Sequence, residues 1–279
     1  MIKSKNFILR LISSFFLLMI FLNMISGDLT IFISIVQISL FFSLWEFLRL
    51  CRFKESDPPR KIINNNFLLT RMKIRKFDYF TIFFICVLNL IFFYKILSIE
   101  FFLLVVFLFL LFLAIRYTKT VVIGLIYLSM PFFFINYYKL NYDFTLFFCF
   151  VIFFTIFSDI GAYFFGNLIG GKKLLEKVSP KKTISGAVGG IVFPLLFCFL
   201  FFNNLVSPWI LVLYCFVFSF FVQSGDLLES YFKRRCFVKD SSNLIPGHGG
   251  ILDRLDGIFL LLISVSILNI LGFNFFFII

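Results

Sequence analysis

Long apolar stretches recur along almost the whole chain, and they restrict its fold more than any other feature of the sequence. A helix needs about 20 mostly apolar residues to cross a bilayer, and nine stretches approach that length. Because backbone polar groups in lipid must be hydrogen-bonded within their own segment, such stretches predict helices. The sequence therefore predicts an all-α, polytopic integral membrane protein with about nine transmembrane helices. The stretches are Leu11–Ser26, Leu29–Leu48, Tyr79–Leu97, Phe101–Ile115, Thr120–Tyr137, Phe144–Gly166, Ile184–Phe202, Trp209–Gly225 and Gly257–Phe276.

The composition supports lipid as the surrounding solvent. Hydrophobic residues make up 61% of the chain and charged residues only 14%, whereas soluble domains are about a quarter charged. The first stretch follows Lys3, Lys5 and Arg10 as a signal peptide would, but no convincing cleavage site precedes the second stretch, so we expect a retained anchor. The six cysteines show no paired spacing and the chain has one histidine, so neither a disulfide framework nor a His-rich metal site is expected.

The lysines and arginines lie almost entirely on one side of these stretches. If the N-terminus is cytoplasmic, the inward-facing segments are 1–10, 49–78, 116–119, 167–183 and 226–256, which hold 24 of the 26 lysines and arginines. Cytoplasmic loops of membrane proteins carry such an excess, so we expect a cytoplasmic N-terminus. The net charge of +12 then reflects topology, and no nucleic-acid partner is expected.

The chain divides into two regions of different character at about residue 150. Region 1–150 contains spans almost free of charge and one long basic cytoplasmic loop, 49–78, and we expect it to anchor the chain. Region 151–279 has acids, glycines and small residues in its spans, with cytoplasmic loops 167–183 and 226–256. We therefore expect the functional site in the second region, at the cytoplasmic face.

Polar residues gather most densely between the eighth and ninth stretches. Asp226, Glu229, Ser230 and Lys233 recur at i, i+3, i+4 and i+7, so they share one face of a helix. That face is typical of the wall of a polar cavity, although an acid at a helix end can also be simply solvated. The segment that follows adds bases, acids and glycines, namely Arg234, Lys239, Asp240, His248, Gly249, Gly250, Asp253, Arg254 and Asp256.

The carboxylates of this cluster predict a magnesium site. Mg²⁺ prefers a few carboxylates together with substrate phosphate oxygens and water, and Asp226 and Asp253, from adjacent helices, would supply them. The alternative for Asp253 and Asp256 is capping of the last helix, whose N-terminus favours acids. The glycines around His248 would let a phosphate approach the backbone, or they form no more than a turn.

A second polar cluster lies between the sixth and seventh stretches. Asp159 falls two turns inside a span, where an acid is costly and therefore functional by default. The lysines after it either receive phosphate or only mark the cytoplasmic side and bind anionic lipid headgroups. The spacing of Gly186, Gly189 and Gly190 is also normal for close helix packing in membranes. The residues expected to bind substrate are Asp159, Tyr163, Lys172, Ser179, Lys181, Lys182 and Thr183, with Glu229, Gly249 and Gly250 from the first cluster.

Together these motifs resemble the phosphatidate cytidylyltransferase (CDP-diacylglycerol synthase) family. Its signature is a serine, an aliphatic residue or Phe two positions on, Lys-Arg, four variable residues, Lys-Asp, a small residue, a Pro- or Gly-containing turn, His-Gly-Gly and Asp-Arg-x-Asp. The resemblance covers roughly residues 154–257 and departs from the family at Ser185, where the family often has Glu. The signature positions are filled by Ser230, Phe232, Lys233, Arg234, Lys239, Asp240, Ser242, Ile245, Pro246, His248, Gly249, Gly250, Asp253, Arg254 and Asp256.

The resemblance implies a nucleotidyl transfer in phospholipid biosynthesis, in which CTP and phosphatidic acid give CDP-diacylglycerol and pyrophosphate. Mg²⁺ on Asp226 and Asp253 would bridge the CTP phosphates, with room for a second cation. The other expected roles are triphosphate binding by Lys233, Arg234, Lys239 and Arg254, orientation of phosphate oxygens by Ser230 and His248, phosphate capture by Lys172, Lys181 and Lys182, and lining of the cavity by Asp159 and Tyr163.

Two rival functions stay open at this point. A CTP-dependent polyprenol or dolichol kinase would transfer the γ-phosphoryl group to an alcohol, and a transporter of a phosphorylated anion would explain the basic loops but not the acids. The aspartate spacing of CDP-alcohol phosphotransferases is absent. The expected partners are CTP, phosphatidic acid and membrane lipids, with a homodimer as one option for assembly, and the expected location is a bacterial inner (plasma) membrane.

Overall fold

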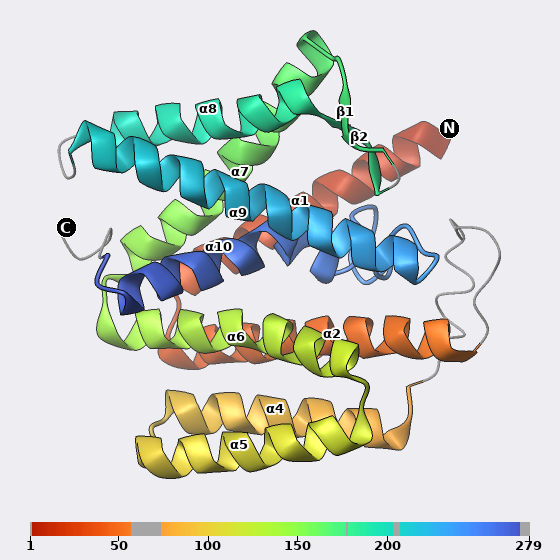
Figure 1. The fold of residues 1–279 in the computed structure, drawn as a ribbon, viewed down its shortest axis with the longest axis vertical. Helices are drawn as coiled ribbons and strands as arrows, with labels where there is room; N and C mark the ends of the chain where they lie inside the picture. Colours follow the sequence, from red (N-terminus) through yellow and green to blue (C-terminus); the bar gives the residue numbers. More distant parts are fainter. Residues whose placement is uncertain (1, 57–73, 177, 203–206, 274–279) are drawn as a thin grey trace. The chain divides into compact units, whose positions relative to one another are not determined.

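The computed structural model describes residues 2–56, 74–176, 178–202 and 207–273. In this part of the chain, helices make up nearly all of the regular structure (Figure 1). They are α1 (Ile2–Ser26), α2 (Leu29–Ser56), α4 (Lys76–Phe93), α5 (Ile99–Arg116), α6 (Lys119–Asn141), α7 (Phe144–Leu168), α8 (Ile184–Phe202), α9 (Pro208–Arg235) and α10 (Leu252–Ile270). Two short strands, β1 (Lys173–Leu175) and β2 (Ser179–Thr183), form an antiparallel hairpin. This hairpin is an addition to the predicted all-α fold.

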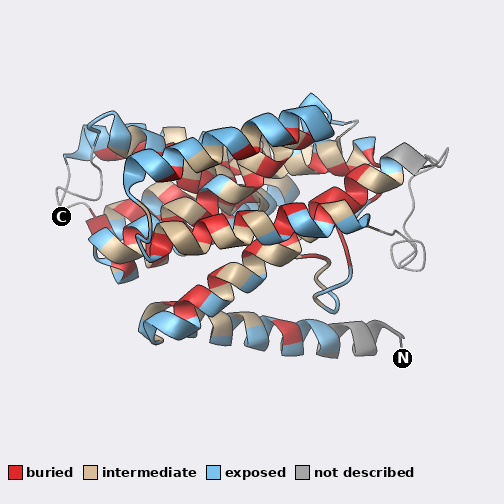
Figure 2. Cartoon of the chain, turned by 90° about the horizontal axis from the view of Figure 1, so that it is seen from below, coloured by how far each residue is buried: buried red, intermediate tan, exposed pale blue. Residues whose placement is uncertain are grey.

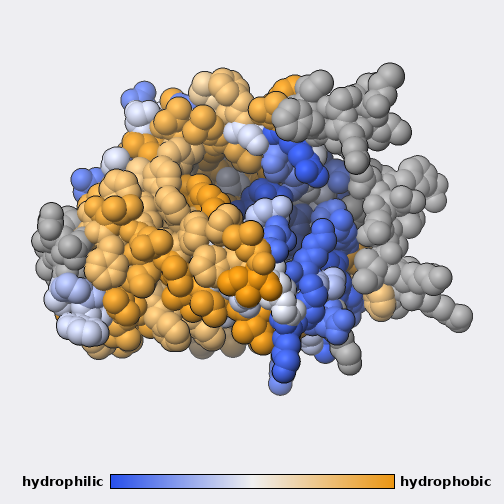
Figure 3. Space-filling view, turned by 90° about the horizontal axis from the view of Figure 1, so that it is seen from above, coloured by the Kyte–Doolittle hydropathy of each residue, from blue (hydrophilic) through white to orange (hydrophobic). Residues whose placement is uncertain are grey.

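Eight of the described helices, all except α10, are long and apolar enough to cross a membrane. Helix α10 carries Asp253, Arg254 and Asp256 within its first five residues. On the face shown in Figure 3, hydrophobic residues cover the larger part, and most of the strongly hydrophilic residues gather in one region. The prediction of a helical, polytopic membrane protein is confirmed, with eight candidate spans where the sequence suggests about nine.

Helix α2 runs beyond the apolar stretch that predicts it. Arg49 and Arg52 lie on this helix and not in the predicted loop 49–78, of which residues 57–73 lie outside the described part. Apolar composition marks where a helix crosses lipid, whereas the backbone hydrogen bonds of the helix continue into polar sequence. The predicted loop is therefore shorter at both ends, since α4 already begins at Lys76.

Helices α9 and α10 shorten the predicted loop 226–256 in the same way. Helix α9 continues to Arg235, more than two turns beyond Asp226, and α10 begins at Leu252. Three basic residues in the last turn of α9 interact favourably with the helix C-terminus. The loop proper is reduced to residues 236–251.

The chain forms two compact units. Unit 1 comprises residues 1–142 and 233–254, and unit 2 comprises residues 143–232 and 255–279. Unit 1 holds α1, α2, α4, α5 and α6 with the end of α9 and the beginning of α10. Unit 2 holds α7, the hairpin, α8 and the remaining parts of α9 and α10. Most of the signature segment thus folds with helices from the N-terminal region of the chain.

Helix α2 is the centre of unit 1, since it packs against α1, α4 and α6. Leu40, Leu44 and Leu48, one turn apart, are almost completely buried, and Figure 2 shows buried residues recurring along the helices. The Arg52 guanidinium makes two hydrogen bonds to the Asp78 carboxylate, at 2.6 and 2.9 Å. This bidentate pair fixes the end of α2 to the start of α4.

In unit 2, glycines bring α7 and α8 close together. A side chain on Gly161 would collide with the backbone of Gly189, and one on Gly186 would collide with the backbone of α7. The Ser158 hydroxyl donates to the Gly190 carbonyl at 3.0 Å. The glycine spacing of the second polar cluster therefore serves close helix packing.

Candidate active site

Residues 236–251, which we call the signature loop, join α9 to α10. Helix α9 ends at Arg235, and two residues later Phe237 lies in the left-handed region, at φ +58°. The Val238 N–H donates to the Lys233 carbonyl. Arg234 Nη1 donates to the Val238 carbonyl at 2.8 Å, so this predicted phosphate ligand also closes the helix end. The loop therefore starts from a fixed point. Beyond it, Lys239 is exposed and Asp240 is half-buried.

Lys233 and Asp253 form a buried ion pair within unit 1. Lys233 Nζ lies 2.6 Å from Asp253 Oδ1, and the two side chains are 10% and 8% exposed. Asp253 Oδ2 accepts hydrogen bonds from the N–H and hydroxyl of Ser241 and from the Gly250 N–H, each at 2.8 Å. Burial opposes ionisation of Asp253, but Lys233 and these N–H donors outweigh it and lower the pKa of the carboxyl. Asp253 is thus a charged group that organises the loop.

Gly249 and Gly250 each fit tightly against a carboxylate. Gly249 has φ +87°, and a Cβ there would lie 2.7 Å from Asp253 Oδ2. A Cβ on Gly250 would collide with the Ser241 hydroxyl and with the Glu46 carboxylate. The structure therefore gives both glycines a packing role, and the predicted contact with substrate would come in addition to it.

His248 lies in the turn of the signature loop and contacts α1. Its Nδ1 is 2.6 Å from Ser13 Oγ, and Arg254 donates to its carbonyl through Nε and Nη2, at 3.1 and 2.9 Å. Burial, together with the positive charges of Arg254 and Arg10, lowers the pKa of His248. The turn thus collects cationic side chains while the imidazole itself favours the neutral form.

The lowered pKa of His248 predicts that unit 1 loses stability in mild acid. The unfolded chain, with an ordinary histidine pKa near about 6.5, binds the proton more readily than the folded chain, so the stabilisation is complete above that pH and lost as pH falls below it. The melting temperature of the purified protein should therefore drop between about pH 7.5 and 5. Because His248 is the only histidine, His248→Gln should flatten this part of the profile, and an unchanged slope would contradict the assignment.

In unit 2, the hairpin brings a lysine to α9. Lys182, on β2, lies 2.5 Å from Asp226 Oδ2, and Ser230, one turn after Asp226, donates to Oδ1 at 3.3 Å. The Lys182 and Asp226 side chains are 27% and 32% exposed, so the pair remains accessible. The two polar clusters that are separate in the sequence meet here.

Thr183 caps the start of α8. Its Oγ1 accepts a hydrogen bond from the Gly186 N–H at 3.1 Å, the usual N-cap arrangement. Ser185, at the position where the resemblance fails, donates to the Gly170 carbonyl at 2.5 Å. It therefore ties α8 to the turn before the hairpin. Of the other predicted residues here, Lys172 and Lys181 are exposed and Ser179 is half-buried.

The remaining predicted residues of unit 2 lie on three helices. Asp256, on α10, touches α9, since a side chain on Gly225 would collide with the Asp256 carbonyl. Asp159 and Tyr163 are exposed along α7, and Glu229 is half-buried on α9. The contact at Gly225 brings the backbone beside Asp226 against that of Asp256.

The carboxylates suit Mg²⁺, which takes few protein ligands and completes its shell with phosphate oxygens and water. Within the described residues, no three His, Cys, Asp or Glu side chains converge as a ready-made metal cluster. Asp226 and Asp253, the predicted ligands, belong to different units. One or two carboxylates with substrate oxygens would be enough, so the donor set fits the predicted ion.

Three side chains that the sequence reasoning missed also contact the signature loop. Ser13 lies against His248, Arg49 Nη2 donates to the Ser241 carbonyl at 2.9 Å, and Glu46 accepts hydrogen bonds from Ser241 and its neighbours. Glu46 is the one acid inside the second apolar stretch, a signal of function by the rule that singles out Asp159. The first region therefore contributes contacts to the signature loop in addition to anchoring the chain.

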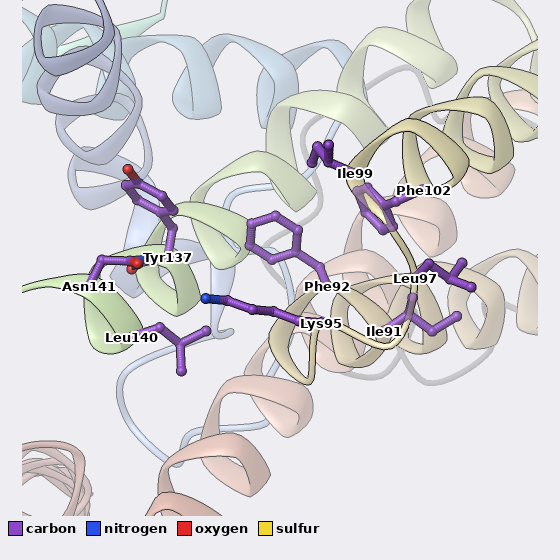
Figure 4. A pocket seen from close by; sticks show the side chains of 9 residues that line it. All are labelled: Ile91, Phe92, Lys95, Leu97, Ile99, Phe102, Tyr137, Leu140 and Asn141. Atoms are coloured by element: carbon purple, nitrogen blue, oxygen red, sulfur yellow. The ribbon is translucent and has the colours of Figure 1, made fainter.

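A separate cavity of about 280 Å³ lies in unit 1, where α4, α5 and α6 meet. Figure 4 shows Lys95 extending between the apolar and aromatic side chains that line it, among them Phe92, Leu140 and Tyr137. None of the predicted site residues lines it. It belongs to the side of the membrane that the charge distribution predicts to be non-cytoplasmic, so it is not the candidate active site.

Comparison with known proteins agrees with the signature. Proteins named phosphatidate cytidylyltransferase are 45% identical over 116 residues in Staphylococcus saprophyticus, 47% over 116 residues in Staphylococcus haemolyticus and 46% over 118 residues in Staphylococcus aureus. Each match covers 40% of this chain and 45% of the relative, so the chain spans slightly less than half the length of these relatives. The sequence model of the Cytidylyltransferase family, in contrast, matches residues 8–271. The chain therefore belongs to the cytidylyltransferase family.

Proposed function

We propose that this protein is a phosphatidate cytidylyltransferase, which condenses CTP with phosphatidic acid to CDP-diacylglycerol and pyrophosphate. The observation that carries the proposal is the signature between Ser230 and Asp256, in which every position is filled. Membership of the cytidylyltransferase family and the names of the relatives point the same way. The proposed location is a bacterial inner membrane, and a homodimer stays a prediction.

The proposed reaction needs positioning and charge neutralisation more than acid–base chemistry. An anionic oxygen of the phosphatidate phosphate attacks the α-phosphorus of CTP, the new P–O bond forms, and the bond from that phosphorus to the pyrophosphate oxygen breaks. No proton has to be removed from the nucleophile. The site must instead hold two polyanions together and stabilise the leaving pyrophosphate.

The cationic side chains of the two clusters would supply that stabilisation. Arg254, exposed and held in place by the His248 carbonyl, and the exposed Lys239 would bind triphosphate oxygens. The ion pair of Lys182, on the hairpin, with Asp226 is accessible. Lys182 would therefore exchange the Asp226 carboxylate for a phosphate of the bound substrate. Lys233 is already committed to Asp253, so its main role in this proposal is to fix that carboxylate.

We propose Asp226 as the carboxylate that would hold Mg²⁺, which would supply positive charge to offset the charge of the leaving pyrophosphate. Asp256, whose backbone touches Gly225, is the candidate for a second carboxylate within unit 2. Asp253 stays a predicted ligand from the sequence alone. Its oxygens already accept four hydrogen bonds, including the one from Lys233, which favours a role in organising the signature loop.

The test is to incubate the purified protein with α-³²P-CTP, phosphatidic acid and Mg²⁺ and to extract the lipids. Label in the lipid phase that requires both phosphatidic acid and Mg²⁺ is the expected result. Label that appears only with γ-³²P-CTP and a polyprenol would instead identify a lipid kinase. Absence of label in both assays would contradict an enzymatic function and favour transport of a phosphorylated anion.

A further inference from the structure

Glu46, an acid of unit 1, accepts four hydrogen bonds from residues 241–252, although it lies outside the signature. It sits on α2 with a fully buried side chain. Its Oε2 accepts from the Ser241 hydroxyl and the Leu252 N–H, both at 2.9 Å, and its Oε1 accepts from the Ile251 N–H at 3.1 Å and from the Ser242 hydroxyl. A buried carboxylate is costly unless it is paired and hydrogen-bonded, so four donors from the signature loop and the first residue of α10 indicate a specific function.

These four donors lie on either side of the glycine turn of the signature loop. Ser241 and Ser242 precede the glycine turn, whereas Ile251 ends the loop and Leu252 is the first residue of α10. The first N–H groups of a helix have no partner within it, so Glu46 caps α10 from 206 residues away in the sequence. One carboxylate therefore closes the loop on itself and attaches it to α2.

Ser241 connects Glu46 to the ion pair of Lys233 and Asp253. The Ser241 hydroxyl lies 2.9 Å from Glu46 Oε2 and 2.8 Å from Asp253 Oδ2, so its one proton is shared between the two carboxylates. The Ser241 N–H donates to Asp253 Oδ2, and Asp253 Oδ1 pairs with Lys233. Arg49, one turn after Glu46, donates to the Ser241 carbonyl at 2.9 Å. Ser241 is thus held on one side by two charged residues of α2 and on the other side by Asp253.

Gly250 adds an independent sign that this arrangement is tight. Any Cβ at this position would collide with the Glu46 carboxylate and with the Ser241 hydroxyl. The last glycine of the His-Gly-Gly motif therefore leaves the space into which Glu46 fits. Helix α2 is itself anchored to α4 by the Arg52–Asp78 pair, so it offers the loop a rigid support.

We propose that Glu46 is a positioning residue of the active site: it fixes the signature loop on α2 and so sets the placement of Asp253 and Arg254. The effect on catalysis rests on the cytidylyl transfer proposed above, whereas the effect on the loop does not. Glu46 acts through the loop, without contact with the substrate.

The variant that tests the proposal is Glu46→Gln, which keeps the size and shape of the side chain. Its amide NH₂ replaces one carboxylate oxygen and then faces hydroxyl and N–H groups that donate to that position in the wild type. Two of the four hydrogen bonds are then lost. Since bonds to charged groups are the stronger ones, kcat/KM for CTP should fall at least about 30-fold. Ser43→Ala is the matched control, because Ser43 is as buried on the same helix and donates only to the Ser39 carbonyl of α2, at 2.8 Å. It should stay within about twofold of the wild type.

Amide hydrogen exchange separates positioning from a general loss of structure. In Glu46→Gln, residues 241–252 should exchange faster while residues 82–93 of α4 keep their protection, and Ser43→Ala should change neither segment. Adding Ser242→Ala to Glu46→Gln should cost little more activity, because the two groups act on the same contact.

Two results would overturn the proposal. One is a folded Glu46→Gln protein with kcat/KM within about threefold of the wild type, a change too small for two lost charged hydrogen bonds. The other is unchanged exchange of residues 241–252 in that variant, whatever its activity. If the wild type itself transfers no cytidylyl group, the proposed function fails, and the exchange experiment still decides the role of Glu46 in the loop.

Discussion

Asp226→Asn is expected to lower kcat/KM for the proposed CDP-diacylglycerol formation at least about 100-fold, because it removes the carboxylate that we propose as the Mg²⁺ ligand. In the structure, the Asp226 carboxylate lies between Lys182 and Ser230 and is about one-third exposed. It is therefore accessible to substrate and metal. The amide keeps the shape of the side chain, so the fold of α9 should be unaffected.

The measurement is steady-state lipid labelling at several Mg²⁺ concentrations, together with the melting temperature of the variant. Glu176→Gln is the matched control, since Glu176 is an exposed acid of the hairpin that carries Lys182 and lies in the same unit as Asp226. It removes the same charge and should keep activity close to wild type. Activity of Asp226→Asn within tenfold of the wild type would show that Asp226 is not essential. Full recovery of activity at high Mg²⁺ would show that Asp226 contributes only to the affinity for the metal.

Lys233→Met is expected to destabilise the protein by about 3–5 kcal/mol, because it leaves the buried Asp253 carboxylate without its counter-charge. The two side chains are 10% and 8% exposed and 2.6 Å apart, so water can replace little of the lost interaction. The melting temperature in detergent should fall by several degrees, and cytidylyl transfer should be lost as the signature loop loosens.

The double variant Lys233→Met with Asp253→Asn is the informative comparison. Removing both charges eliminates the unpaired buried carboxylate, so most of the lost stability should return, while activity should stay low because Asp253 no longer organises the loop. If the double variant is no more stable than Lys233→Met, the destabilisation comes from lost packing of the lysine and not from the ion pair.

The sequence was sufficient for the architecture because apolar length reports directly on membrane-crossing helices. It was less accurate at the helix ends, as α2 and α9 show, since hydrogen bonding of a helix continues where apolar composition stops. It also could not assign partners to charges. The ion pairs of Lys233 with Asp253 and of Lys182 with Asp226 join residues whose roles were predicted one at a time.

The main feature that the sequence did not predict is the contact of the first region with the signature loop. Glu46 stands alone in an apolar stretch, with no motif around it, and its four partners lie about 200 residues further along the chain. Local patterns cannot reveal such a contact. Thr183 and Gly250, which were predicted to bind substrate, also have structural roles in capping and close packing that the motif alone did not indicate. Their contact with substrate stays a prediction.

The contact between Glu46 and Ser241 also constrains how the protein is made. The two residues are 195 positions apart, and at about 5–20 residues per second a ribosome needs about 10–40 s to synthesise the intervening chain. During that time α2 must enter the bilayer with an acid that has none of its later partners, which is costly in lipid. Arg49, one helical turn away, can neutralise Glu46 in the meantime. The arginine would then serve the nascent chain before it serves the finished loop.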